Sequence, residues 1–129
     1  MSGRGRARLL ARALWEMLRY DALSQLAGFP AIRRSMGAVC RAAERPTASA
    51  VEAAVGAVAF LTSFYWKPLL CLERSVVTAR LLRAQGVPAE VVIGCRVRPF
   101  FTHAWVEVDG RVVNDSPAYQ NSLEPLDRF

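Results

Sequence analysis

Three side chains of this sequence, Cys71, His103 and Asp115, have the types and the chain order needed for nucleophilic catalysis. In such a site a cysteine thiolate attacks the substrate, a histidine moves the proton, and a carboxylate orients the histidine. His103 is the one histidine in the chain, so any imidazole chemistry must use it. Cys71 is expected in the first turn of a helix, where free N–H groups favour a thiolate. A free cysteine is as often a buried apolar residue, so residue types alone leave both interpretations open.

Whether His103 can meet Asp115 depends on the turn at Asp109-Gly110. A two-residue turn would send the two side chains to opposite faces of the sheet, because side chains alternate along a strand. A three-residue loop, with the glycine left-handed in a bulge, pairs Glu107 with Arg111. In this arrangement the side chains of His103 and Asp115 lie on the same face of the sheet. A catalytic pair requires the second arrangement, so we predict the bulged loop and a positive φ at its glycine.

The segments before Cys71 are expected to be helical. Apolar residues recur at helical spacing over 6–20, residues 28–30 break the pattern, and a second, weaker stripe covers 32–43. It includes Ile32, Met36, Val39, Cys40 and Ala43. Ser49 to Glu52 has the form of a capping box, with the serine as N-cap. The stretch 53–66 is uncharged but shorter than the roughly 20 residues of a membrane span, which predicts a buried core helix.

From residue 67 onwards a helix and then strands are predicted. Pro68 suits the first position of a helix that runs to about Gln85, and Gly86 suits its left-handed end. Strands are expected at 90–97, 102–108 and 111–114, the first of them central. Helices followed by a small antiparallel sheet predict an α+β fold. We expect one domain over 1–129, with a helical part at 1–66 and the Cys-bearing helix and sheet at 67–129.

The composition limits the classes of function. The chain is 53% hydrophobic and 22% charged, which suits a globular domain and excludes disorder. Residues 1–45 hold nine arginines against three acidic residues, while the remainder is balanced. The basic excess could meet an acidic protein, an anionic lipid surface or nucleic acid. No nucleic-acid motif is visible, so we expect solubilising charge, no nucleic-acid partner and no membrane association. Three scattered cysteines predict reduced thiols in a cytoplasmic protein.

Several segments between Cys71 and Asp115 have a distinctive local sequence. They are Cys71-Leu72-Glu73-Arg74-Ser75, Leu81-Leu82-Arg83-Ala84-Gln85-Gly86-Val87-Pro88-Ala89, Val91-Val92-Ile93-Gly94, Pro99-Phe100-Phe101-Thr102-His103-Ala104-Trp105-Val106-Glu107-Val108-Asp109-Gly110 and Val112-Val113-Asn114-Asp115. These segments resemble the B2 leader-peptidase family of lasso-peptide biosynthesis, which has a transglutaminase-like, papain-related fold. The resemblance is dense over 71–115 and looser over 1–70.

The resemblance implies a function and partners. The family's catalytic cysteine, histidine and aspartate fall on Cys71, His103 and Asp115, without departure at these positions. No winged recognition domain is visible, so the chain resembles the split form of the family. The expected partners are therefore a lasso precursor peptide, a separate leader-recognition (B1) protein and the lasso cyclase that closes the ring. No cofactor is implied.

Other side chains are candidates for the same site. Trp105 is predicted on the face of His103, where it could wall a substrate cleft or pack in the core. Tyr65 and Trp66 are candidate substrate contacts or a second oxyanion donor. A zinc site would need Cys40, Cys71, Cys95 and His103, but no Cys-x-x-Cys pair supports it, and we expect no metal. A non-catalytic module that presents the precursor, and an amine-accepting acyltransferase, remain alternatives to the peptidase.

Overall fold

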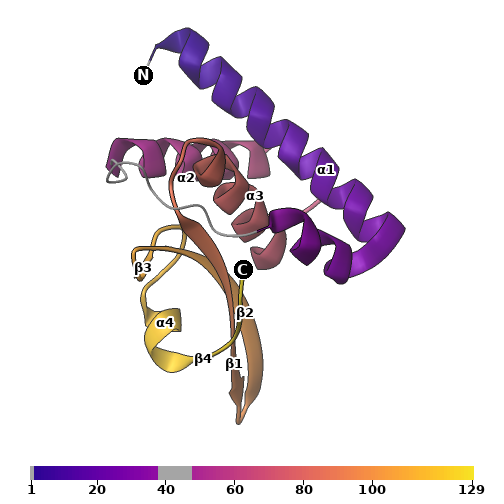
Figure 1. The fold of residues 1–129 in the computed structure, drawn as a ribbon, viewed down its shortest axis with the longest axis vertical. Coiled ribbons are helices and arrows are strands. Elements are labelled where there is room, and N and C mark those ends of the chain that lie inside the picture. The colour runs from indigo at the N-terminus through magenta and orange to yellow at the C-terminus, as the bar shows by residue number, and fades with distance from the viewer. Residues whose placement is uncertain (1, 38–47) are drawn as a thin grey trace.

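The computed structural model describes residues 2–37 and 48–129 (Figure 1). The elements are α1 (Gly3–Met36), α2 (Ala48–Thr62), α3 (Cys71–Ala84), β1 (Ala89–Val97), β2 (Phe100–Val108), β3 (Arg111–Val112), α4 (Ala118–Ser122) and β4 (Glu124–Arg128). Three helices gather on one side of the molecule and the strands extend away from them, which confirms the predicted α+β order. The predictions for Val39, Cys40 and Ala43 lie outside the described residues.

Helix α1 is longer than the predicted segment 6–20, because the break at Gly28 is a kink within it. Gly28 has φ 72° and ψ −170°, and the chain resumes its helical path at once. The side turned to the core also differs from the predicted stripe: Leu14 and Leu18 are exposed, whereas Glu16 is buried. Glu16 is buried because Arg80 of α3 reaches it, with 3.4 Å between Nη1 and Oε2. The periodic pattern of apolar residues does not predict burial of Glu16, because it contains no information about its partner Arg80.

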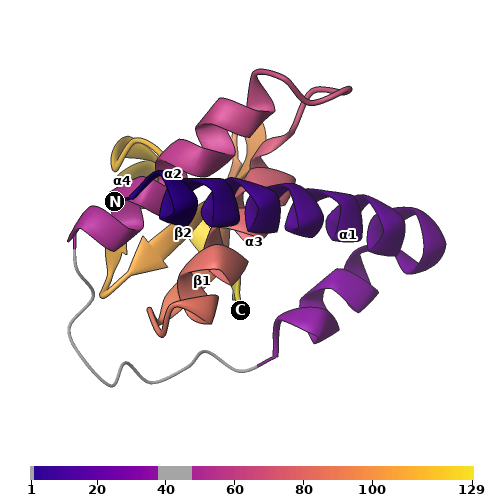
Figure 2. The same ribbon diagram turned by 90° about the horizontal axis from the view of Figure 1, so that it is seen from above.

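Helix α2 is less buried than predicted. Only Ala54, Ala57 and Val58 are buried along it. Ser49 lies inside the helix, which already includes Ala48, so the predicted N-cap is wrong. Other apolar positions are half-buried or, like Phe60, exposed, and the helix packs on α1 and α3. Figure 2 shows α1 running across α2 and α3, and of these three helices α3 makes the main contact with the sheet.

Helix α3 begins at Cys71, three residues later than the predicted start at Pro68. Leu70 has φ −80° and ψ 169°, the extended conformation of an N-cap residue. Before it, Lys67 contacts both Asp21 of α1 and Glu73 of α3, and these contacts hold the preceding segment outside the helix. The predicted end is confirmed, since the helix stops at Ala84 and Gly86 has φ 81°.

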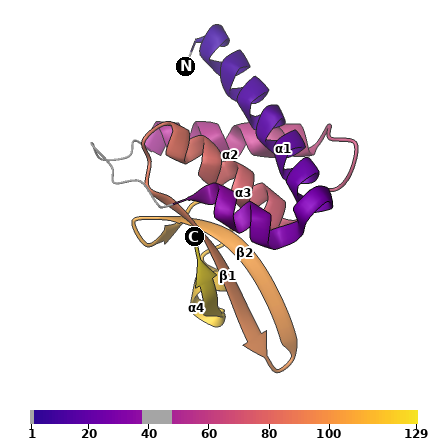
Figure 3. The same cartoon turned by 45° about the vertical axis from the view of Figure 1, so that its right-hand side comes forward.

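The sheet has the strand order β3-β2-β1-β4, so β1 is internal as predicted. β1 and β2 form a long antiparallel hairpin whose turn lies at the end away from α1, α2 and α3 (Figure 3). One face of the hairpin, including Val91 and Val106, packs in the main core with α3. The opposite face holds a second, smaller cluster of Val92, Trp105 and Leu123. In the described residues no helix is both long and apolar enough to span a bilayer.

The turn between β2 and β3 differs from the predicted bulge. Val108 pairs with Arg111 across a two-residue turn, so the predicted pairing of Glu107 with Arg111 is wrong. Asp109 and Gly110 have φ values of 51° and 76°, as a type I′ hairpin turn requires. The positive φ at Gly110 is therefore confirmed. Asp109 tolerates the left-handed region better than most residues, which makes the shorter turn available.

Candidate functional site

Cys71 is the first residue of α3 and is half-buried. The side chain of its N-cap residue, Leu70, gives no capping hydrogen bond, so the first N–H groups of α3 stay available to an anion near the thiol. The rest of α3 is held in place because Val76, Val77 and Leu82 are fully buried. The predicted location of Cys71 in the first helical turn is thus confirmed, and a rigid element presents its sulfur.

His103 and Asp115 are in direct contact. Nε2 of His103 lies 2.6 Å from Oδ2 of Asp115, and the two side chains are 12% and 26% exposed. A proton on Nε2 would be donated to the carboxylate, which leaves the lone pair of Nδ1 for another partner. This is the relation that a base and its orienting group require.

A single side chain explains how His103 and Asp115 meet although the turn has two residues. Val113 N–H donates to the carbonyl of Val106 at 3.0 Å, in the register that the turn sets. Val106 N–H donates to the side-chain Oδ1 of Asn114 at 2.8 Å. The amide of Asn114 thus ends the backbone ladder, and strand alternation stops with it. Asp115 is then not confined to the face that parity assigns to it.

Asn114→Ala is expected to lower both stability and activity. Asn114 also donates from Nδ2 to Oγ of Ser75 at 3.3 Å, so it joins β2 to α3. Its loss leaves the main-chain N–H of Val106 without its acceptor, at a cost of about 2 kcal/mol in unfolding free energy. Urea denaturation measures this cost. Asn121→Ala, on the exposed surface of α4, is the matched control, and equal stability of the two variants would refute the role given to Asn114.

The imidazole of His103 is packed among aromatic rings. Its centroid lies 4.0 Å from that of Tyr119 on α4, and 6.1 Å and 6.4 Å from those of Phe101 and Trp105. Tyr119 was missed in the sequence analysis, where no periodicity links it to the site. Together the rings restrict the imidazole to the orientation in which it reaches Asp115.

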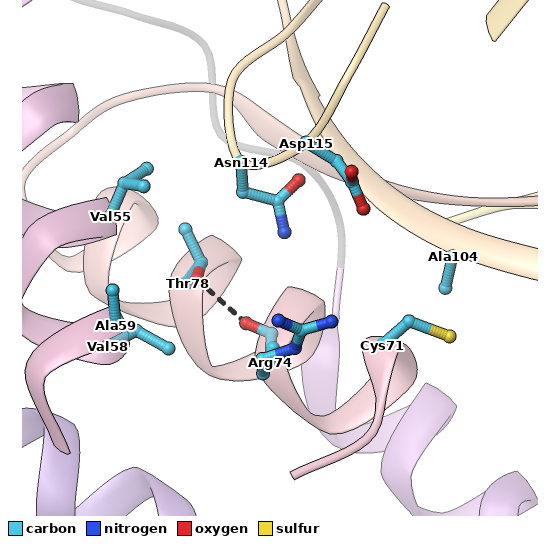
Figure 4. A pocket seen from close by; sticks show the side chains of 9 residues that line it. All are labelled: Val55, Val58, Ala59, Cys71, Arg74, Thr78, Ala104, Asn114 and Asp115. Carbon is cyan, nitrogen blue, oxygen red and sulfur yellow. Dashed lines mark hydrogen bonds between the residues drawn. The ribbon is translucent and has the colours of Figure 1, made fainter. Parts of the chain in front are cut away.

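The first of two small pockets beside Cys71 contains Asp115 (Figure 4). It encloses about 60 Å³. One wall is apolar and comes from α2, and the rest comes from α3, from Ala104 of β2 and from the polar segment after β3. The lining residues are Val55, Val58, Ala59, Cys71, Arg74, Thr78, Ala104, Asn114 and Asp115.

The second pocket contains His103 and encloses about 140 Å³. Cys71 and Ala104 line both pockets, so the cysteine stands between the space that holds Asp115 and the space that holds His103. The structure contains no hydrogen bond between Cys71 and His103. Contacts between catalytic groups are often long without substrate and shorten when it binds. Cys71 therefore shares one pocket with Asp115 and the other with His103, and neither of the two pockets is lined by all three residues.

Two residues named as candidate substrate contacts, Trp105 and Tyr65, make hydrogen bonds to other side chains of the protein. Trp105 lies on the face of His103 as predicted, but it is fully buried, and its Nε1 donates to Oε2 of Glu107 at 2.8 Å. Of the two alternatives for Trp105, packing in the core is the one that the structure shows. Burial alone would raise the pKa of Glu107, but the hydrogen bonds from Trp105 and Arg128 lower it below its usual range. Tyr65 donates from its hydroxyl to Asp21.

Trp66 and Cys95 complete the residues singled out by sequence. Trp66 is 70% exposed in the segment that precedes Cys71, where a peptide could contact it. Cys95 is half-buried on β1. Among the described residues no three His, Cys, Asp or Glu side chains are arranged to hold a metal ion.

The fold and the site define a class: an α+β protein with a cysteine at a helix N-terminus, and a histidine on a sheet strand that contacts an aspartate. A family model, "Transglutaminase-like superfamily", matches residues 14–128, and the chain belongs to this superfamily. Over 56 residues the chain is 43% identical to the microcin J25-processing protein McjB of Escherichia coli. The match covers 43% of this chain and 27% of that protein, so it spans about a quarter of the relative's length. No solved structure matches the chain.

Proposed function

We propose that this protein is a cysteine peptidase that removes the leader from a ribosomally made lasso-peptide precursor. It acts with a separate leader-recognition (B1) protein and before a cyclase closes the ring. The observation that carries the proposal is the 2.6 Å contact of His103 with Asp115 beside a cysteine at a helix N-terminus. The likeness to a microcin-processing protein supports a peptide precursor as the substrate.

The proposed reaction proceeds in the following steps. Nδ1 of His103 takes the proton of the Cys71 thiol while Nε2 stays bonded to Asp115. The thiolate attacks the scissile carbonyl, and the free N–H groups at the start of α3 stabilise the negative charge that develops there. His103 then returns its proton to the leaving amine, and the leader stays bound to Cys71 as a thioester. Water, activated by His103, hydrolyses the thioester and restores the thiol.

Mass spectrometry of products tests the proposal. The precursor is incubated with the leader-recognition protein and this chain, and the products are weighed. Free leader acid and free core peptide support hydrolysis, whereas leader joined to an added amine supports an acyltransferase. Intact precursor, with the chain still required by the cyclase, supports a presenting module. At low precursor concentration we expect faster cleavage with the leader-recognition protein, because tethering raises the local substrate concentration. Equal rates with and without it would contradict the partnership.

Asp115→Asn is expected to slow cleavage about 10⁴-fold, less than removal of Cys71 or His103. The amide keeps the size of the carboxylate but carries no charge for a protonated imidazole, and it can favour the wrong tautomer of His103. Single-turnover cleavage rates measure the effect. Asp109→Asn, in the exposed turn, is the matched control and should cleave like the wild type. A wild-type rate in Asp115→Asn would remove Asp115 from the proposed site.

A further inference from the structure

Arg74 lies one helical turn after Cys71 and lines the same pocket. The two residues are three positions apart on α3, a spacing that brings side chains together on one face of a helix. Both line the pocket that contains Asp115. Figure 4 shows the guanidinium of Arg74 directed into the space between the Cys71 side chain and the segment after β3. Arg74 therefore brings a positive charge into a pocket that the candidate nucleophile lines.

This positive charge has no acidic partner within the described part of the chain. Every ion pair there is formed by other side chains, and Arg74 is exposed. Among the described lining residues Asp115 alone is acidic, but both of its oxygens are engaged. Oδ2 lies 2.6 Å from Nε2 of His103, and Oδ1 accepts the main-chain N–H of Ser116 at 2.8 Å. The guanidinium is thus free to bind a group that enters from solvent.

The pocket suits a short side chain that ends in a carboxylate. A water molecule needs about 10–15 Å³ of such a cavity, so the 60 Å³ of this pocket admit about four to six non-hydrogen atoms, the size of an acidic side chain. Val55, Val58 and Ala59 of α2 form an apolar wall for its methylene groups. The planar guanidinium of Arg74 offers paired N–H donors that match the two oxygens of a carboxylate.

We propose that Arg74 binds a carboxylate of the peptide substrate, and that this pocket is a subsite for an acidic side chain next to the scissile bond. Cys71 lines the pocket, so a side chain held there belongs to a residue close in sequence to the carbonyl that Cys71 attacks. The inference rests on the proposed function, which makes the ligand a peptide. The preference for a carboxylate can nevertheless be measured at Cys71 without any peptide.

The first test compares alkylation of Cys71 by iodoacetate, which carries a carboxylate, with alkylation by its neutral counterpart iodoacetamide. Peptide mass spectrometry resolves Cys71, and Cys95 is the internal reference. We expect Arg74→Met to lower the ratio of the iodoacetate rate to the iodoacetamide rate at Cys71 about fivefold, the upper range for an exposed ion pair. High salt should lower the wild-type ratio in the same direction. Arg74→Lys, which keeps the charge, should retain most of the wild-type ratio.

The ratio separates binding of a carboxylate from other effects, because both reagents react with the same thiolate and a change in thiol ionisation cancels. Arg111→Met is the matched control: it removes another exposed arginine that lines neither pocket beside Cys71, and it should leave the ratio unchanged. An unchanged ratio in Arg74→Met would overturn the proposal. An equal fall in Arg111→Met would also overturn it, since net charge would then explain the result. Arg74→Gln replaces Arg74→Met if the methionine variant does not fold.

The second test uses cleavage of precursors that carry Asp or Asn at each of the two residues on either side of the cleaved bond. At one of these positions we expect the wild type to have a lower KM for Asp than for Asn, and Arg74→Met to lose this preference with little change in kcat. Absence of any preference that depends on Arg74 would contradict the subsite. If no precursor is cleaved, the peptidase proposal fails, and the alkylation ratio still decides whether Arg74 binds a carboxylate.

Discussion

Cys71→Ala will abolish leader removal, and His103→Ala will do the same, while each variant stays folded. Each residue is the one candidate for its role among the side chains around the two pockets. Loss of a nucleophile or its base from a catalytic unit lowers the rate by about 10⁴ or more. Alanine is the best helix former, so its introduction at the first position of α3 should not weaken the helix.

Matched variants separate loss of chemistry from loss of structure. Cys95→Ala removes another half-buried free thiol, and it should cleave the precursor like the wild type. Melting temperature is measured for every variant, because His103 packs on Tyr119 and its truncation will cost some stability. A folded Cys71→Ala that still releases the leader at the wild-type rate would end the peptidase proposal. Residual cleavage in His103→Ala that depends on added imidazole would instead support the role of the histidine.

The sequence was informative wherever local chemistry determines structure. Alternating apolar residues predicted β1, and its internal place follows from two apolar faces. A glycine after the last periodic residue predicted the end of α3 at Gly86. The sequence correctly predicted that Cys71 lies in the first turn of α3, but the predicted start of the helix, Pro68, is three residues too early. Pro68 is a good first helical residue, and the sequence does not show the ionic contacts of Lys67 that hold this segment outside the helix.

Register and burial were less predictable because they depend on tertiary contacts. The hairpin illustrates this: two turns fit Asp109-Gly110, and strand alternation alone favours the bulged loop. The actual turn is shorter, and the side chain of Asn114 ends the ladder before Asp115. His103 and Asp115 therefore meet because the side chain of Asn114 interrupts the strand, which strand periodicity does not predict. Trp105 was placed on the correct face, yet only the packed structure shows that its ring is inaccessible.

Gly94→Ala is expected to destabilise the protein and to slow cleavage, although it adds a single methyl group. A Cβ at Gly94 would lie 2.5 Å from Cη2 of Trp105 and 3.0 Å from Cβ of Leu123. Trp105 cannot move away freely, since it is fully buried and its Nε1 is bonded to Glu107. Forced overpacking of this kind costs about 1–3 kcal/mol in unfolding free energy.

Gly94→Ala should also disturb the candidate site, because Gly94 pairs directly with His103 across the hairpin. Displacement of the Trp105 ring shifts its neighbour His103, and its 2.6 Å contact with Asp115 tolerates little movement. Urea denaturation and single-turnover cleavage measure the two effects. Gly56→Ala in α2 is the matched control: nothing lies within 4 Å of its added methyl, and it should stabilise the helix by about 0.5–1 kcal/mol. If both alanine variants gained stability, the packing of Trp105 against Gly94 would not be what holds His103 in place.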